Sequence, residues 1–351
     1  MRPSGRDLSE KLTELVIEVR LRGRARLDLH LQQCLGWKSR ARIQRLIELG
    51  RVDVNGQLAK ASQRVTEGDR IRVAVVDGPD PTAPHSLPPD WSVPFWEDPY
   101  LLAINKPPHC LVHPVGRAVT GTVMNELHAR YRSCNRAGQR PVVPKLCHRL
   151  DRETSGVLLV AKTDPARREV QRAFEDDRVR KEYLAIVEGE PATDRFDVDL
   201  PVAVRLDRGR SKGNRLATTA PDGRASLTHF EVLARLGGIA LVRCRPRTGR
   251  QNQIRVHLAA TGHPILGDTG YGSSAERWAR GVGQAIATPF PGRALLHSVG
   301  LDFPHPIWGT RCQLNAPPPD DFGALIVAQG ITTIPTAGPP LARSEPGPSP
   351  G

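Results

Sequence analysis

The sequence lacks the features of a secreted or membrane-spanning protein. None of its 6 cysteines forms a C-x-x-C pair, and their wide spacing fits reduced thiols better than a disulfide framework. It contains no apolar stretch of about 18 residues, the length that a transmembrane helix requires. Residues 1–10 are polar and lack the apolar core of a secretory signal. We therefore expect a cytoplasmic protein without a membrane partner.

Acidic residues are too few to balance the basic ones. The chain of 351 residues has 37 Asp and Glu against 50 Lys and Arg, for a formal net charge of +13. This excess indicates a polyanionic partner, of which nucleic acid is the first candidate, although a charge that serves solubility would give the same number. The hydrophobic content of 39% supports a folded core, and the length suits two domains.

Residues 24–76 have the pattern of a small separate unit. A leucine repeat at helical spacing comes first, at Leu27, Leu31 and Leu35. Ser39 is suited to cap a second helix. The dipeptide Asn55-Gly56 then stands between two segments of alternating apolar and polar residues, which predicts a β-hairpin.

Basic residues gather on and around the second predicted helix, at Lys38, Arg40, Arg42, Arg45 and Arg51. The amino end of a helix adds a positive dipole, so phosphates could bind there. An ordinary basic solvent face would look the same, but in so small a unit we favour RNA contact. Residues 39–73 resemble the RNA-binding domain named after ribosomal protein S-four. That resemblance implies recognition of folded RNA by its shape and backbone.

The remaining chain divides by composition. Residues 1–23 form an N-terminal extension, in which residues 15–19 alternate like an edge strand. The proline-rich residues 77–94 read as a semi-stiff linker. Residues 95–315 mix strand and helix patterns without regular βαβ alternation, which predicts an α+β domain with a mixed, largely antiparallel sheet and flanking helices. Residues 316–351 are rich in Pro and Gly, and we expect them to be mostly disordered.

One stretch of the larger domain concentrates charge around a single acid. Asp151 lies among His148, Arg149 and Arg152, and a Ser-Gly pair and an apolar run that predicts a buried strand follow. A carboxylate this close to fixed positive charge is expected to be ionised and held in place. A structural ion pair in a turn would show the same pattern.

Several segments of the larger domain resemble the RluA-type RNA pseudouridine synthases: residues 101–114 (LLAINKPPHCLVHP), 148–163 (HRLDRETSGVLLVAKT), 180–189 (RKEYLAIVEG), 247–272 and 295–306. The HRLD stretch with its following TSG is the most specific of these. The resemblance covers most of the domain and implies the pseudouridine synthase fold. It also implies isomerisation of uridine to pseudouridine within RNA, without a cofactor or a metal.

The resemblance also implies a role for individual residues. Asp151 matches the catalytic aspartate, and Arg149 matches the arginine that helps to displace the target nucleotide. Tyr183 matches the tyrosine that stacks on the flipped uracil, and Arg255 matches the arginine that pairs with the catalytic carboxylate. Further candidate RNA contacts are His148 and Arg250.

Residue chemistry is compatible with these roles. Flipping a base out of a helix costs a few kcal/mol, and stacking on an aromatic ring returns roughly 1–3 kcal/mol. The carboxylate of Asp151 could attack C1′, attack the base or abstract a proton, and the sequence leaves all three open. Each residue also has a structural alternative. Tyr183 could be a half-buried core residue, Arg255 could pair with His257 on a helix surface, and Arg149 could be a structural partner of Asp151.

Two segments depart from the family pattern. Asn252 stands where the family more commonly has His, and it still offers both a donor and an acceptor. Residues 205–224 carry basic side chains at Arg205, Arg208, Arg210, Lys212, Arg215 and Arg224. We interpret them as a basic insertion that faces RNA, with disorder as the alternative.

Other functions were weighed against this one. A non-catalytic RNA-binding or ribosome-assembly factor would not need Asp151, Tyr183 and Arg255 together. A metal-dependent hydrolase would use His109, Cys110, His113, Cys147 and His148, but nearby prolines disfavour the helix that would align the first histidines. A glycosidase lacks an evident second acid beyond Glu153. We expect large-subunit ribosomal RNA as the substrate, with transfer RNA as the alternative, and take a monomer as the default.

Overall fold

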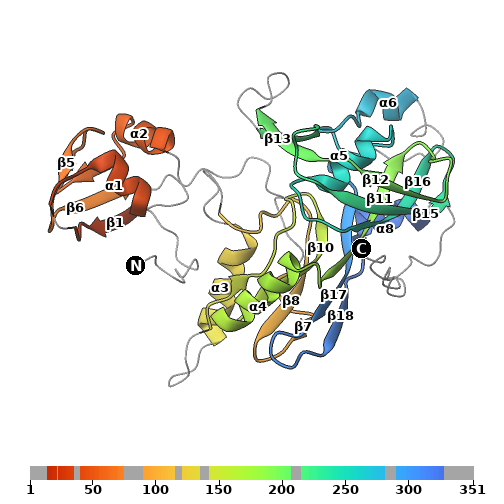
Figure 1. Cartoon of the computed structure of the whole chain (residues 1–351), viewed down its shortest axis with the longest axis horizontal. Helices are drawn as coiled ribbons and strands as arrows, with labels where there is room; N and C mark the ends of the chain where they lie inside the picture. The colour runs from red at the N-terminus through yellow and green to blue at the C-terminus, as the bar shows by residue number, and fades with distance from the viewer. Residues whose placement is uncertain are drawn as a thin grey trace, which may run out of the picture. The chain divides into compact units, whose positions relative to one another are not determined.

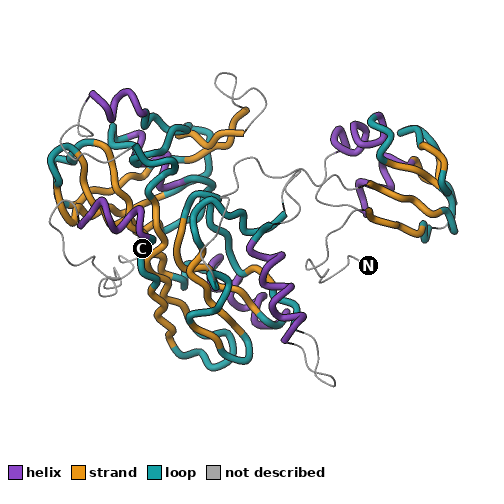
Figure 2. The backbone as a smooth tube through the Cα atoms, turned by 180° about the vertical axis from the view of Figure 1, so that it is seen from behind, coloured by secondary structure: helices purple, strands orange, loops and turns teal. Residues whose placement is uncertain are grey.

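The computed structural model describes residues 14–21, 23–34, 40–74, 90–114, 121–134, 142–206, 215–280 and 290–327. The chain forms two compact units, Met1–Ala83 with His113–Val143 and Pro84–Val112 with Pro144–Gly351. Within the described ranges no helix combines the length and apolarity needed to cross a membrane. Figure 1 labels the elements along the chain, and Figure 2 shows their secondary structure from behind.

The first unit contains a four-stranded sheet of order β1-β6-β3-β4, in which each pair of neighbours is antiparallel. Its strands are β1 (Glu14–Glu18), β3 (Val52–Val54), β4 (Gln57–Leu58) and β6 (Arg70–Ala74). The other elements are β2 (Ala25–Arg26), α1 (Leu27–Cys34), α2 (Arg40–Glu48), β5 (Arg64–Val65) and α3 (Val123–Cys134). Buried side chains from both layers form its core, among them Leu27, Leu31, Ile43, Val65 and Ile71.

Sequence patterns located most of these elements. The leucine repeat forms α1, and Asn55 and Gly56 take positive φ values of 54° and 81° in the turn between β3 and β4. This is the backbone that a tight hairpin requires. The predicted edge strand is confirmed as β1, which pairs with β6 and therefore extends the sheet of this unit. Leu35 and Ser39 lie outside the described residues.

The second unit is built on a 10-stranded sheet of order β12-β15-β16-β11-β17-β10-β8-β7, with β18 paired to β17 and β9 paired to β10. Among its described pairs only β10 and β17 run parallel. Its strands are β7 (Trp96–Glu97), β8 (Leu101–Lys106), β9 (Lys145–Leu146), β10 (Ser155–Ala161), β11 (Arg180–Glu188), β12 (Arg195–Asp199), β15 (Leu227–Arg235), β16 (Ile239–Pro246), β17 (Leu296–Pro304) and β18 (Arg311–Asn315). The predicted mixed, largely antiparallel α+β fold is confirmed.

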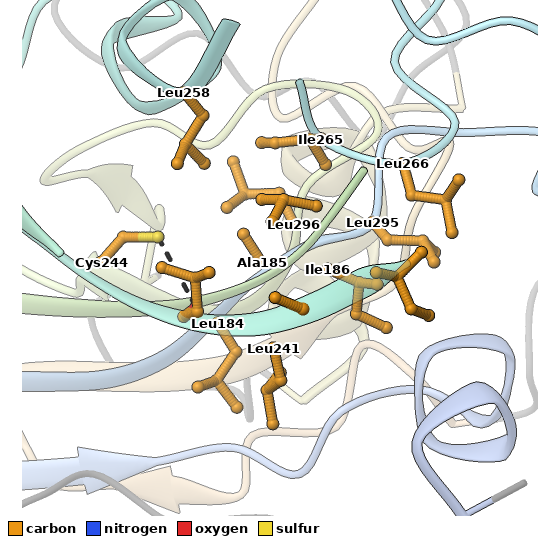
Figure 3. Close-up of a cluster of buried hydrophobic side chains, with 14 of the residues drawn as sticks. Leu184, Ala185, Ile186, Leu241, Cys244, Leu258, Ile265, Leu266, Leu295 and Leu296 are labelled. Atoms are coloured by element: carbon orange, nitrogen blue, oxygen red, sulfur yellow. Dashed lines mark hydrogen bonds between the residues drawn. The ribbon is translucent and has the colours of Figure 1, made fainter. Parts of the chain in front are cut away.

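Helices and a separate hairpin accompany this sheet: α4 (Asp164–Glu175), α5 (Gln253–Ala260), α6 (Ala275–Arg280), α8 (Asp320–Val327), and β13 (Val202–Leu206) paired with β14 (Arg215–Thr219). The hairpin occupies the predicted basic insertion, of which residues 207–214 lie outside the described part. Leu258 of α5 packs with Ile265 and Leu266 against Leu184 and Leu241 of the central strands, as Figure 3 shows.

Part of the expected disordered tail is folded. Helix α8 lies within residues 316–351 and buries Phe322, Leu325 and Ile326 in the core of the second unit. The prediction of disorder is wrong for this helix, because composition averaged over a Pro- and Gly-rich segment hides a short apolar cluster. Residues 328–351 lie outside the described residues.

Gly156 occupies the point of closest approach between β10 and β17. Its φ is +111°, and a Cβ at this position would lie 2.1 Å from the carbonyl oxygen of Ser298. Only glycine fits a backbone approach this close. The Ser-Gly pair that follows the Asp151 stretch in the sequence is thus the start of β10, where the strand meets its parallel partner.

We expect Gly156→Ala to lower the free energy of unfolding by at least ~3 kcal/mol, because the new methyl group collides with rigid backbone. The matched control is Gly237→Ala, at φ +67° with no atom within 4 Å of the added Cβ. That control should cost only ~1–2 kcal/mol of backbone strain. Urea denaturation of both variants measures the difference, and equal losses would contradict the steric argument.

Candidate active site

Asp151 lies in the loop between β9 and β10, immediately before the buried centre of the sheet. The backbone N–H of Thr154 donates to the carbonyl oxygen of Asp151 at 3.2 Å, which closes a tight turn. Lys106, Gly156, Ser298 and Tyr183 face one another in register across β8, β10, β17 and β11. The loop therefore places Asp151 beside the end of a row that crosses four strands.

Lys106 holds this loop from inside the protein. Its side chain is fully buried, and its Nζ donates to the carbonyl oxygens of Pro107 at 2.8 Å, Cys110 at 2.9 Å and Arg152 at 3.0 Å. Three acceptors match the three protons of an ammonium group. Burial works the other way and lowers the pKa of Lys106 to about 7. The lysine ties residues 107–110 to the residue that follows Asp151.

A second buried cation holds the next residue of the loop. Arg293 is 1% exposed, and its Nη1 donates to the carbonyl oxygen of Glu153 at 3.1 Å. Its Nε and Nη2 bind Asp321 of α8 at 2.6 and 2.9 Å. The backbone N–H of Ala294 also donates to the Glu153 carboxylate at 3.0 Å. The carbonyl groups of both residues after Asp151 are thus bound by buried cations.

Asp151 itself sits in a mixed electrostatic environment. Burial raises the pKa of Asp151 above its ordinary value, and Asp268 adds to this rise. The charges of Arg255, Lys106 and Arg149 oppose it. The sequence led us to expect a carboxylate held ionised by neighbouring arginines, with a lowered pKa. The structure corrects the direction, because desolvation outweighs these charges.

Arg255 is oriented by a different carboxylate from the one expected. Its Nε and Nη2 donate to Asp268 at 2.6 and 2.8 Å, and its guanidinium lies 4.8 Å from the ring centroid of Tyr271. Asp268 is 1% exposed, so this is a buried ion pair. Among the described residues no hydrogen bond joins Arg255 to Asp151, although its charge is the largest that acts on that carboxylate.

Tyr183 is directed into the site by an irregularity of β11. The register of β11 against β17 shifts between Glu182 and Tyr183, which places Tyr183 opposite Ser298. Tyr183 is thereby brought beside the Ser298 side chain on the neighbouring strand. Burial, followed by the charge of Asp151, raises the pKa of Tyr183 well above its ordinary value, so it remains a neutral phenol. A β-bulge is a common means of aiming a side chain at a site.

The other candidates in this unit divide into exposed and structural groups. Arg149 is exposed next to Asp151, as a nucleotide-displacing residue would need to be. His148 is partly buried, and its Nε2 accepts a hydrogen bond from the backbone N–H of Leu159 at 3.0 Å. Burial lowers the pKa of His148 to about 4, so the ring is neutral where it binds the backbone of β10, and its expected RNA contact stays a prediction. Arg250 binds the carbonyl oxygen of Ala225 and lies near Arg224.

The basic residues of the first unit are partly committed to ion pairs. Arg40 donates to Asp28, whose side chain is fully buried, so it stabilises the packing of α2 against α1. Arg45 pairs with Glu48 at 3.2 Å on the surface of α2, and Arg51 is partly exposed. Neither Lys38 nor the side chain of Arg42 lies within the described part of the structure.

Sequence reasoning missed Lys106, Arg293 and Asp268. Lys106 ends an apolar strand, where a lysine is unexpected. A charged residue at the end of such a buried strand was the sequence feature that could have identified it. The other two follow loops and gave no local pattern. In the described ranges no three His, Cys, Asp or Glu side chains converge as metal ligands.

The burial of Lys106 generates a prediction about stability. Lys106→Met leaves three carbonyl groups unpaired and should lower the free energy of unfolding by ~3 kcal/mol or more. Because the pKa of Lys106 is lowered to about 7, the unfolded chain binds a proton above that pH that the folded chain has lost. The stability of the wild type relative to the variant should therefore rise from pH 7 to pH 9 in urea denaturation. A falling difference would contradict the shift. Lys181→Met is the control variant, since Lys181 is a lysine whose pKa is also lowered, to about 8, but whose Nζ donates to the carbonyl oxygen of Thr248 outside the Asp151 loop.

Comparisons with known proteins identify the families of both parts of the chain. Residues 100–260 match the RNA pseudouridylate synthase family, and residues 25–71 match the S4 domain family. An uncharacterized RNA pseudouridine synthase, YlyB of Bacillus subtilis, is 35% identical over 305 residues, which cover 86% of this chain and 93% of the relative. Ribosomal large subunit pseudouridine synthase D of Vibrio parahaemolyticus is 35% identical, with 86% of this chain and 90% of the relative covered.

A solved structure shows the same architecture. Human RNA Pseudouridylate Synthase Domain Containing 4 superposes with a TM-score of 0.51 at 26% identity, covering 68% of this chain and 92% of the human chain. The sheet topology, the loop that presents Asp151 and these likenesses lead to one conclusion. The chain belongs to the RNA pseudouridine synthase family and is an RNA pseudouridine synthase that carries an N-terminal S4 domain.

Proposed function

We propose that this enzyme converts uridine to pseudouridine in large-subunit ribosomal RNA, in the cytoplasm, with Asp151 as its essential group. The observation that carries the proposal is the Asp151 loop, in which buried cations bind the next two carbonyl groups and the Asp151 charge interacts with Arg255 and Tyr183. The assignment to ribosomal RNA is supported by relatives named ribosomal large subunit pseudouridine synthase D. The S4 domain supports binding to structured RNA.

The reaction is an isomerisation in which composition is conserved. The bond between C1′ and N1 breaks, a bond between C1′ and C5 forms, C5 loses its proton and N1 gains one. Asp151 acts as the carboxylate, by attack on C1′, by attack on the base or by accepting a proton. The carbonyl groups after it are held by Lys106 and Arg293, so the carboxylate is positioned before the substrate binds.

Base flipping gives Arg149 and Tyr183 complementary roles. A uridine in a helix is inaccessible until it leaves the stack, and an exposed arginine beside the site can occupy the vacated space. Tyr183 then receives the uracil on its ring. The register shift of β11 aims this ring before the substrate binds. Arg255, held by Asp268, supplies positive charge opposite Asp151 without being drawn into contact with it.

Asp151→Asn should lower isomerisation by at least ~1,000-fold and leave RNA binding nearly unchanged, because the amide keeps the shape of the side chain and loses its charge. The test maps pseudouridine in total RNA from cells that lack the gene and are complemented with either form. Asp176→Asn, which alters an exposed carboxylate at the end of α4, is the matched control. Wild-type levels of pseudouridine in cells that carry Asp151→Asn would refute the proposed role. If the sites lost without the gene lie in transfer RNA, the substrate is transfer RNA and not ribosomal RNA.

The pH dependence of activity should report Asp151. Because its pKa is raised, the active carboxylate is lost as pH falls through a value above that of an ordinary aspartate. Arg255→Gln removes the largest opposing charge. This variant should shift the acid limb of kcat/KM to higher pH and lower the plateau by ~100-fold. Arg152→Gln should leave the limb in place, and the assignment of Arg255 would be wrong if only Arg152→Gln lost activity.

A further inference from the structure

Asn252, the residue before α5, forms hydrogen bonds with Tyr271 and Arg255. It precedes α5 with φ +53°, in the left-handed region. Its Nδ2 donates to the Tyr271 hydroxyl at 3.0 Å, and its Oδ1 accepts from Arg255 Nη1 at 3.3 Å. One neutral side chain thus joins the hydroxyl of Tyr271 to the guanidinium that faces Asp151.

These contacts replace an ordinary stabilising one. An asparagine before a helix usually accepts a hydrogen bond from a free N–H of the first turn, which is worth about 1 kcal/mol. Asn252 forms no such cap bond. The amide is directed instead toward Arg255, away from the helix that it precedes. Local stability has been given up for a contact inside the site, which is typical of functional positions.

Tyr271 extends the connection to a second segment of the chain. Its ring packs with Ala217 of β14 and with Val202 and Val256. Its other contact is with Arg255, whose guanidinium lies over the ring. Tyr271 is therefore bound at its hydroxyl by Asn252 and packed against β14, and its face lies against the arginine.

We propose that Asn252 is a positioning residue for catalysis, which holds Arg255 in the orientation that faces Asp151. Asp268 fixes two nitrogens of the guanidinium, Nε and Nη2, on one edge. Asn252 fixes the third, Nη1, and secures the ring beneath the group. The inference rests on the proposed roles of Asp151 and Arg255. It concerns a residue that would act through Arg255, with which it shares a hydrogen bond.

An amide suits this task better than the other residues that tolerate this backbone. Glycine adopts the left-handed region but has no side chain, and aspartate lacks the N–H donor and adds a negative charge near Asp268. Asparagine donates and accepts at the same time, and its state does not change with pH. It therefore connects Arg255 to Tyr271 without altering the net charge around Asp151.

The decisive variant is Asn252→Gly, which removes the amide while relieving the backbone of any strain. We expect kcat to fall about 10- to 100-fold with KM within about twofold, because Arg255 loses its alignment while RNA binding is preserved. The melting temperature should stay close to that of the wild type. Asn55→Gly is the matched control, since Asn55 also has a left-handed backbone, with φ +54°, in the hairpin of the first unit. Its kcat should be unchanged.

A second variant separates positioning from a purely structural role. Asn252→Asp keeps the acceptor for Arg255 and should recover part of the kcat that glycine loses. It should also move the acid limb of kcat to higher pH, because its charge joins the set that acts on Asp151: Arg255, Lys106, Arg149 and Asp268.

Three results would overturn the proposal: wild-type kcat in Asn252→Gly, a change confined to KM, or an equal loss of kcat in Asn55→Gly. Failure of the proposed function would appear differently, as full activity in Asp151→Asn whatever the behaviour of Asn252. The two ideas therefore fail on different variants. Measurements use the full-length protein and a uridine-containing fragment of large-subunit ribosomal RNA.

Discussion

The structure depends on the capture of two backbone carbonyl groups by buried cations. Lys106 binds the carbonyl of Arg152 and Arg293 binds that of Glu153, directly after Asp151. A buried charge is costly unless acceptors surround it, and here the acceptors are the loop that must be held still. The desolvation of each cation is offset by contacts that fix the catalytic loop. Stability and positioning therefore come from the same hydrogen bonds.

Two arginines around the Asp151 loop, Arg255 and Arg293, each pair with a carboxylate other than Asp151. Arg255 pairs with Asp268 and Arg293 pairs with Asp321, and in the described part of the chain no ion pair is formed by Asp151. A carboxylate bound tightly by an arginine would be a poor group for attack on a sugar or a base. In the proposed mechanism, burial and positive charge without direct contact would keep this carboxylate available for the reaction, as electrostatic preorganisation requires.

Much of the fold and part of the site were predictable from the sequence. Alternating strands, the Asn55-Gly56 turn and the HRLD stretch are local patterns, and each was found where it was expected. The partner of Arg255 was not predictable, because Asp268 reaches it only through the packing of α5. The rise in the pKa of Asp151 was missed for a related reason: the sequence shows adjacent charges but not burial. The folded part of the tail was hidden by average composition.

The ion pair between Arg293 and Asp321 links the site to the last described helix. Asp321 lies in α8, and Arg293 joins it to the carbonyl of Glu153. During synthesis, the loop that carries Asp151 is made long before α8 emerges from the ribosome. The support behind that loop is complete only after α8 has been translated and has paired with Arg293. A nascent chain could therefore bind RNA through its S4 domain well before its catalytic loop is fully held.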